Sequence, residues 1–183
     1  MAHLFLWQVK LPTWNINNSI LREIYMAKAK KRAEAYKGKG YGKLRYMLYT
    51  SAKSRIEECI EHGYYGEAVT IIESVITDRL ESRISFLKKE NVGFGTLGHL
   101  IKEAKKVETD AELLDLFAEL DNWREKRNTA VHELVKIEDG QELVDWDNRM
   151  KSVGDTAREG YGLLKLVYKR VADLNPKHID RIF

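Results

Sequence analysis

The chain has 183 residues, of which 44% are hydrophobic and 32% charged, the size and composition of one ordinary globular domain. A single cysteine, Cys59, excludes an intrachain disulfide framework, and no apolar run approaches the roughly 18 residues of a membrane span. Residues Met1–Pro12 have neither the basic region nor the small-residue cleavage site of a signal peptide. We therefore expect a cytoplasmic protein that does not enter membranes.

The net charge of +3 is distributed unevenly along the chain. Residues 1–60 carry 12 Lys or Arg against 4 Asp or Glu, and most of this excess lies in Lys28–Arg45. Tyrosines are interleaved with these basic residues, a pattern typical of single-strand binding, in which cations follow phosphates and rings stack on bases. The candidate nucleic-acid-binding residues are Lys30, Lys31, Arg32, Lys37, Lys39 and Lys43. The alternative is a solvated helix end whose tyrosines pack against the protein.

Helical periodicity dominates the sequence, and the connections are short, which predicts an all-α antiparallel bundle of about six helices. In chain order, the first three expected helices run from Asn17 or Asn18 to about Tyr36, from Leu44 to about Glu61 and from Tyr65 to about Glu90. A short fourth helix is capped by Thr96, and a fifth is capped by Thr109 or Asp110 and broken at Asp139-Gly140. The sixth runs from Trp146 to about Leu174.

The chain is expected to have two parts, a basic helical extension over residues 1–43 and a compact bundle over residues 44–183. The glycine-rich stretch Gly38–Lys43 lacks the spacing of a phosphate-binding loop, so we interpret it as a flexible basic hinge. Cys59 and His62 have the spacing of metal ligands, but no second pair stands at a suitable spacing. No metal or cofactor is expected.

One arginine interrupts an apolar helical stripe. At 100° per residue, Arg127 lies within about 60° of Leu116, Leu120, Trp123, Ala130 and Leu134. Burial of a guanidinium without a partner is costly, so this position requires an anion or an interface. Glu73 and Asp78, on the predicted helix from Tyr65, could pair with Arg127 across the bundle as a structural salt bridge.

Two further polar residues flank Arg127 on the same predicted helix. Asn128 and His132 lie about 100° and 140° around the helix from Arg127, so a straight helix does not bring His132 and Arg127 together. A helix break near Thr129, or a second copy of the chain, would close this gap.

The stretch Arg127-Asn128-Thr129-Ala130-Val131-His132 resembles the Arg-x4–6-His signature of HEPN-domain proteins, including the polar residue directly after the arginine. The setting is similar too, because the signature follows a long amphipathic helix late in an all-α chain. The resemblance covers about Leu44–Leu174. One departure concerns regulation: many family toxins silenced by a nucleotidyltransferase antitoxin carry a Tyr two residues after the His, where this chain has Leu134.

The resemblance implies a metal-independent endoribonuclease, commonly a toxin or an antiviral-defence effector, that acts as a homodimer. His132 would exchange protons with the ribose 2′-hydroxyl or the leaving 5′-oxygen, since imidazole titrates near neutrality. Arg127 would stabilise charge on the phosphorane, and Asn128 would orient the imidazole or hold a phosphate oxygen. The implied partners are RNA, a second copy of the chain and an antitoxin protein.

The alternative is a non-catalytic helical module that binds nucleic acid or a partner protein, since many family members are inactive. Exposure of Arg127 and His132 together in a basic groove would favour the enzyme. An Arg127 bridged to a carboxylate, with His132 alone on the surface, would favour the module. For the enzyme we expect a twofold interface along Leu113–Leu134, which would bring two copies of the motif to one axis.

Overall fold

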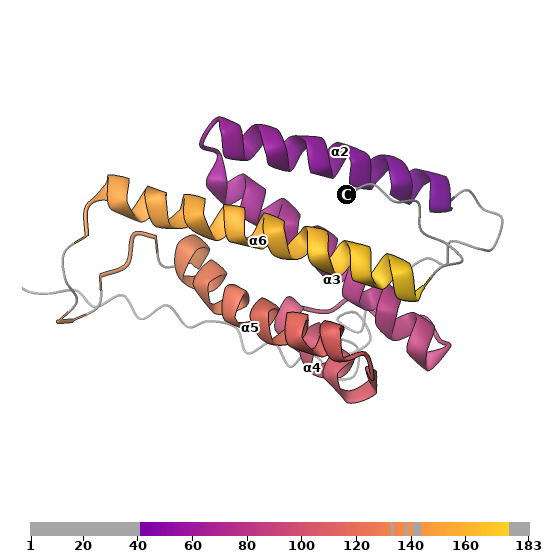
Figure 1. Cartoon of the computed structure of the whole chain (residues 1–183). Helices are drawn as coiled ribbons and strands as arrows, with labels where there is room; N and C mark the ends of the chain where they lie inside the picture. The colour runs from indigo at the N-terminus through magenta and orange to yellow at the C-terminus, as the bar shows by residue number, and fades with distance from the viewer. Residues whose placement is uncertain (1–40, 133, 138, 141–143, 176–183) are drawn as a thin grey trace, which may run out of the picture. The chain divides into compact units, whose positions relative to one another are not determined.

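A computed structural model of the chain describes residues 41–132, 134–137, 139–140 and 144–175, all within a unit that spans residues 31–183. These residues form five packed α-helices and no β-strand, which confirms the predicted all-α class (Figure 1). The predicted first helix, which ends near Tyr36, lies outside the described residues. The helices are α2 (Tyr41–Glu61), α3 (Tyr65–Lys88), α4 (Leu97–Val107), α5 (Ala111–His132) and α6 (Trp146–Leu174).

The long helices form a bundle in which α3 packs on α2, α4, α5 and α6. The pairs α2–α3 and α5–α6 are antiparallel, as predicted (Figure 1). The connection between α2 and α3 is short, whereas the one between α5 and α6 spans residues 133–145. By contrast, α3 and α6 run in the same direction. Tyr65 at the start of α3 contacts Arg158 in the middle of α6, and Arg83 near the end of α3 contacts Asn175 just after the end of α6.

The predicted helix ends are largely confirmed. Thr96 caps α4 by accepting from the His99 amide, and Asp110, rather than Thr109, caps α5 by accepting from the Leu113 amide at 3.0 Å. The turn between α2 and α3 contains Gly63 at φ +80°, a left-handed conformation that glycine adopts without a steric cost.

Two predicted boundaries were wrong. Helix α2 begins at Tyr41 rather than Leu44, so Lys43 is helical. The first turns of α2 are fixed on α3, where Asp78 pairs with Arg45 and accepts a hydrogen bond from Tyr49.

The second wrong boundary is the end of α5, which ends at His132 rather than at Asp139. Residues 134–137 are not helical. Arg149 of α6 donates to the carbonyl oxygens of Leu134 and Lys136, each at 3.0 Å, and this contact stabilises the chain in its turn toward α6.

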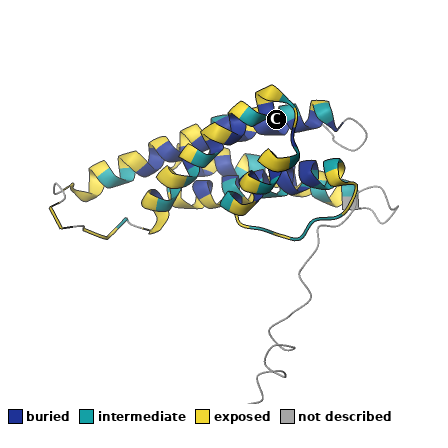
Figure 2. Ribbon diagram, turned by 90° about the horizontal axis from the view of Figure 1, so that it is seen from below, coloured by how far each residue is buried: buried dark blue, intermediate teal, exposed yellow. Residues whose placement is uncertain are grey.

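The core lies where the helices face one another, and the exposed side chains lie on their outer faces (Figure 2). Trp123 of α5 is fully buried, and its indole nitrogen donates to the Thr156 carbonyl at 2.9 Å. Helix α6 approaches this ring closely at Gly160, where an added Cβ would lie 2.5 Å from the indole. Trp123 therefore fixes α5 against α6 one turn before Arg127.

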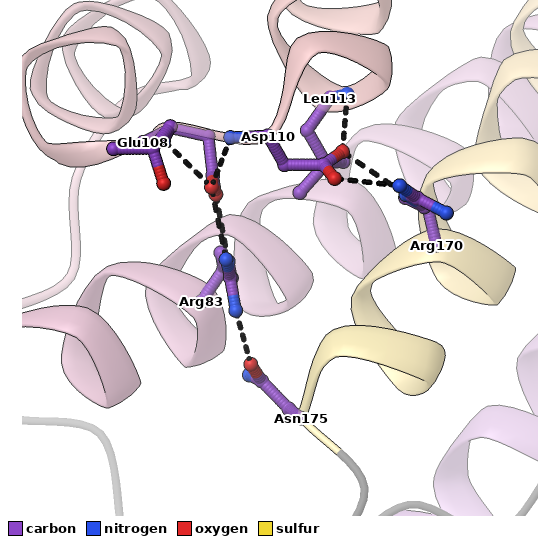
Figure 3. Close-up of polar contacts among 7 residues, drawn as sticks. Arg83, Glu108, Asp110, Leu113, Arg170 and Asn175 are labelled. Atoms are coloured by element: carbon purple, nitrogen blue, oxygen red, sulfur yellow. Dashed lines mark hydrogen bonds and ion pairs between the residues drawn. The ribbon is translucent and has the colours of Figure 1, made fainter.

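A buried polar network ties α3 to the α4–α5 connection and to the end of α6 (Figure 3). Arg83 donates to both carboxylate oxygens of Glu108, at 2.7 and 2.9 Å, and to the side-chain oxygen of Asn175 at 2.8 Å. The Glu108 carboxylate also accepts from the amides of Thr109 and Asp110. Burial by itself would raise the pKa of Glu108, but Arg83 and these amides outweigh it and lower that pKa.

Within the described part of the chain, no helix is both long and apolar enough to cross a membrane.

Candidate functional site

Arg127 lies on the buried side of α5, as its place in the apolar stripe predicted. Its side chain is 13% exposed, and the guanidinium forms an ion pair with Glu73 of α3. This confirms one of the two predicted partners. The other prediction was wrong: Asp78 contacts Tyr49 and Arg45 of α2 instead.

The ion pair leaves part of the Arg127 side chain unsatisfied. Nε is buried and has no hydrogen-bond partner within the described structure. Burial, which disfavours the charged form, lowers the pKa of Arg127, yet the ordinary value for arginine lies so far above neutrality that the guanidinium stays charged. Arg127 is therefore a buried cation with unused capacity to donate a hydrogen bond.

Arg127 also lines a pocket of about 620 Å³ between α3, the start of α4 and α5. The α3 side of this pocket presents Thr70, Glu73, Ser74 and Thr77, which share one helix face because their spacing is i, i+3, i+4 and i+7. The α5 side presents Arg124, Arg127 and Asn128. The pocket thus combines hydroxyl groups and two guanidinium groups with a single carboxylate.

Asn128 faces this pocket together with Arg127, so the structure brings two of the three predicted catalytic residues to one site. Its side chain is partly buried, and no hydrogen bond of this amide is found among the described residues. An unoccupied amide can both donate to and accept from a ligand.

His132, the third predicted catalytic residue, is not brought to the pocket. It is the last residue of α5, and it is exposed. The helix continues without a break through Thr129, so the expected break that would turn His132 toward Arg127 is absent from α5. Within one chain, Arg127 is bridged to a carboxylate and His132 stands on the surface, the arrangement that the sequence analysis associated with a binding module.

The predicted twofold interface along Leu113–Leu134 cannot use the apolar stripe of α5. Leu113, Leu116, Leu120 and Trp123 are buried in the protein's own core, because the stripe packs against α6 and α4. The apolar side chains that stay exposed near the motif lie further along the chain. They are Val131, Val135, Ile137, Val144 and Trp146.

The basic segment can be placed only at its end. Lys43 is an exposed residue in the first turn of α2, whereas Lys30, Lys31, Arg32, Lys37 and Lys39 lie outside the described residues. The described residues contain no group of three or more His, Cys, Asp or Glu side chains that could hold a metal ion.

Sequence reasoning missed Arg124 and the hydroxyl-bearing face of α3. Arg124 extends over the start of α4, where an added Cβ at Gly98 would lie 3.2 Å from its Cδ. Two signals could have found these residues. Arg124 stands one turn before Arg127, and Thr70, Glu73, Ser74 and Thr77 repeat at helical spacing on the side of α3 opposite its apolar stripe.

Comparison with known proteins adds no relative: no family model matches the chain, and no characterised protein or solved structure is similar to it.

Proposed function

We propose that this protein is a helical RNA-binding module of HEPN type, in which Arg127 and Asn128 bind a phosphate of the RNA strand. The observation that carries the proposal is the pocket that both residues line. Guanidinium groups bind phosphate oxygens through forked donors, and Nε of Arg127 is a donor that no group among the described residues uses. The HEPN assignment itself is supported by the Arg127-Asn128-His132 signature on a late helix of an all-α bundle.

The test is the affinity for a fluorescently labelled single-stranded RNA, measured by anisotropy over a range of salt concentrations. Arg127→Gln is expected to weaken binding about tenfold and to reduce the salt dependence by the equivalent of about one phosphate contact. Lys126→Gln is the matched control, since Lys126 is the adjacent residue, pairs with Glu159 and does not line the pocket.

Equal effects of the two substitutions would contradict the proposal, because general charge attraction would then account for binding. Arg127→Lys keeps the positive charge but lacks the paired N–H donors of a guanidinium. Weaker RNA affinity in a folded Arg127→Lys protein therefore reports the loss of phosphate binding rather than a loss of folding. Thermal melting followed by circular dichroism establishes that each variant is folded.

A second candidate function is RNA cleavage by a homodimer, and the exposure of His132 favours it. His132 is exposed at the end of α5, so its imidazole is accessible to a ligand. Exposed Val131 and Val135 lie beside it in the sequence, and Trp146 begins α6. These apolar side chains offer a second copy a contact surface that could bring one chain's His132 to the other chain's Arg127.

In such a dimer the 2′-hydroxyl oxygen attacks phosphorus and the bond to the 5′-oxygen breaks. One His132 accepts the 2′-hydroxyl proton, the other donates a proton to the 5′-oxygen, and Arg127 stabilises the charge on the phosphorane. The products are a 2′,3′-cyclic phosphate and a 5′-hydroxyl. A role as a toxin or defence effector in the cytoplasm would follow from this activity.

His132→Ala separates the two functions. If the dimer cleaves RNA, the wild-type protein is expected to do so in EDTA, and the substitution should lower the rate by about 10²–10⁴ without changing RNA affinity. Mixed dimers with one Arg127→Gln subunit should lose most of the activity. RNA binding without cleavage in EDTA would leave the binding module as the function, and cleavage that is unchanged in His132→Ala would contradict the mechanism.

A further inference from the structure

The pocket is larger than a single phosphate requires. Its volume of about 620 Å³ lies within the range of sites for small organic ligands, roughly 300–1,000 Å³. Its two long walls differ in chemistry, because α5 contributes cations and α3 contributes hydroxyl groups. A ligand that fills the pocket must therefore carry an anionic group at one side and hydrogen-bonding groups at the other.

The cationic wall contains a second guanidinium besides Arg127. Arg124 precedes Arg127 by three residues, so the two side chains leave α5 on adjacent turns of the same face. Its Nε donates to Asp121 at 2.9 Å, one of its terminal nitrogens pairs with Glu125 at 3.4 Å, and its side chain is 27% exposed. Of the charged residues that line the pocket, two are arginines and one is Glu73, so the lining itself has a net charge of +1, while Asp121 and Glu125 lie beside Arg124 outside the lining.

Two hydroxyl groups of the α3 wall are placed to accept hydrogen bonds from a ligand. Thr70 Oγ1 donates to the Gly66 carbonyl at 2.9 Å, and Thr77 Oγ1 donates to the Ser74 carbonyl at 2.9 Å. The hydrogens of these two hydroxyls are thus used within α3, and their oxygen lone pairs remain for a ligand. These two oxygens suit a ligand group that donates, such as a sugar hydroxyl.

We infer that the pocket is a subsite for one ribonucleotide, in which Arg124 joins Arg127 at the phosphate and the Thr70 and Thr77 hydroxyl oxygens accept from the ribose. This inference rests on the proposed RNA binding and names the residues that would select ribose. The 2′-hydroxyl is the group by which a protein distinguishes RNA from DNA at a given site. Thr70 and Thr77 are therefore the specificity residues, and Arg124 binds RNA and DNA alike.

The experiment compares the affinities for RNA and DNA strands of the same sequence. The double substitution Thr70→Val and Thr77→Val is expected to reduce the RNA preference about tenfold and to leave DNA affinity unchanged. Thr50→Val is the matched control, because Thr50 of α2 donates in the same way, to the Tyr46 carbonyl, and does not line the pocket. Arg124→Gln should weaken the affinities for the RNA strand and the DNA strand about tenfold relative to Lys126→Gln.

A second arm uses adenosine monophosphate and its 2′-deoxy form, with calorimetry as the readout. Binding of the ribonucleotide that requires Arg124, Thr70 and Thr77 supports the subsite, even if no RNA strand binds and the proposed function fails. Conversely, the protein could bind RNA with an affinity that Arg124→Gln and the double threonine variant lower no more than their controls do. That result would overturn the subsite and would leave the proposed function in place. An unchanged RNA-to-DNA ratio in a folded double variant likewise overturns it.

Discussion

Two arginines of this bundle are paired with carboxylates in its interior, and their surroundings differ. Arg83 is 6% exposed and Glu108 is fully enclosed, and the structure gives that pair partners on both sides. Arg127 is 13% exposed and Glu73 is 25% exposed, and Nε of Arg127 has no partner among the described residues. The first pair joins three segments of the fold, whereas the second lies on a pocket.

This difference separates a structural ion pair from one available for binding. A buried network in which each group is satisfied stabilises one arrangement of the chain. A buried donor without a partner carries a free-energy cost, and a ligand that satisfies it recovers that cost. The same residue types, enclosed at Arg83 and less enclosed at Arg127, thus favour a structural role for the first pair and support the proposed ligand-binding role for the second.

The largest effect is expected at the enclosed pair. Glu108→Ala leaves the Arg83 cation without its carboxylate and removes the acceptor of the Thr109 and Asp110 amides. The free energy of unfolding, measured by urea denaturation, should fall by about 3–5 kcal/mol. Glu103→Ala, which removes a carboxylate paired with two exposed lysines, should cause a much smaller change. Similar losses of unfolding free energy in Glu108→Ala and Glu103→Ala would contradict the special structural role of the Arg83–Glu108 pair.

A smaller change in stability and an opposite change in binding are expected at Glu73. Glu73→Gln keeps a hydrogen-bond acceptor for Arg127 but removes the negative charge that competes with phosphate. Unfolding free energy should fall by about 1 kcal/mol, while RNA affinity increases about threefold. Glu67→Gln, on the same helix and paired with Arg55 away from the pocket, is the control. A weaker affinity in Glu73→Gln would show that Glu73 organises the site rather than competing within it.

Two carboxyl groups at the α4–α5 connection, Glu108 and Asp110, should contribute to the dependence of stability on pH. The pKa of Asp110 is lowered chiefly by its hydrogen bonds with Arg170, and the pKa of Glu108 is lowered as well. A carboxyl group with a lowered pKa in the folded state stabilises the protein fully above its unfolded pKa, about 3.9 for Asp and 4.3 for Glu. That contribution is lost as the pH falls through the lower, folded values.

Urea denaturation at a series of pH values between 6 and 2 should therefore show a loss of stability that begins near about pH 4. Asp110→Asn should flatten this dependence, while Glu73→Gln should leave most of it in place. An acid transition that is identical in Asp110→Asn and the wild type would show that other carboxylates carry it.

The sequence predicted the helices better than the site, for physical reasons. Thr96, Asp110 and Gly63 are local signals, and each marks a helix end in the structure. The wrong ends depend on contacts distant in sequence, such as those of Arg149 with the carbonyls of Leu134 and Lys136. No local pattern encodes such a contact.

For the site, helical periodicity predicted that Arg127 would be buried and that Glu73 could reach it. It also predicted correctly that a straight helix separates Arg127 from His132. It could not predict the pocket, because the pocket depends on where α4 begins relative to Arg124. That position is set by packing among three helices.

The contact between Trp123 and Gly160 has a consequence for related sequences. A side chain at position 160 would meet the indole at 2.5 Å, so the two positions cannot change independently while α5 and α6 keep this spacing. In any chain that shares this fold, alanine or serine at the position of Gly160 should coincide with a smaller residue at the position of Trp123. This paired substitution, together with two arginines one turn apart at the positions of Arg124 and Arg127, is a signature by which diverged members could be identified.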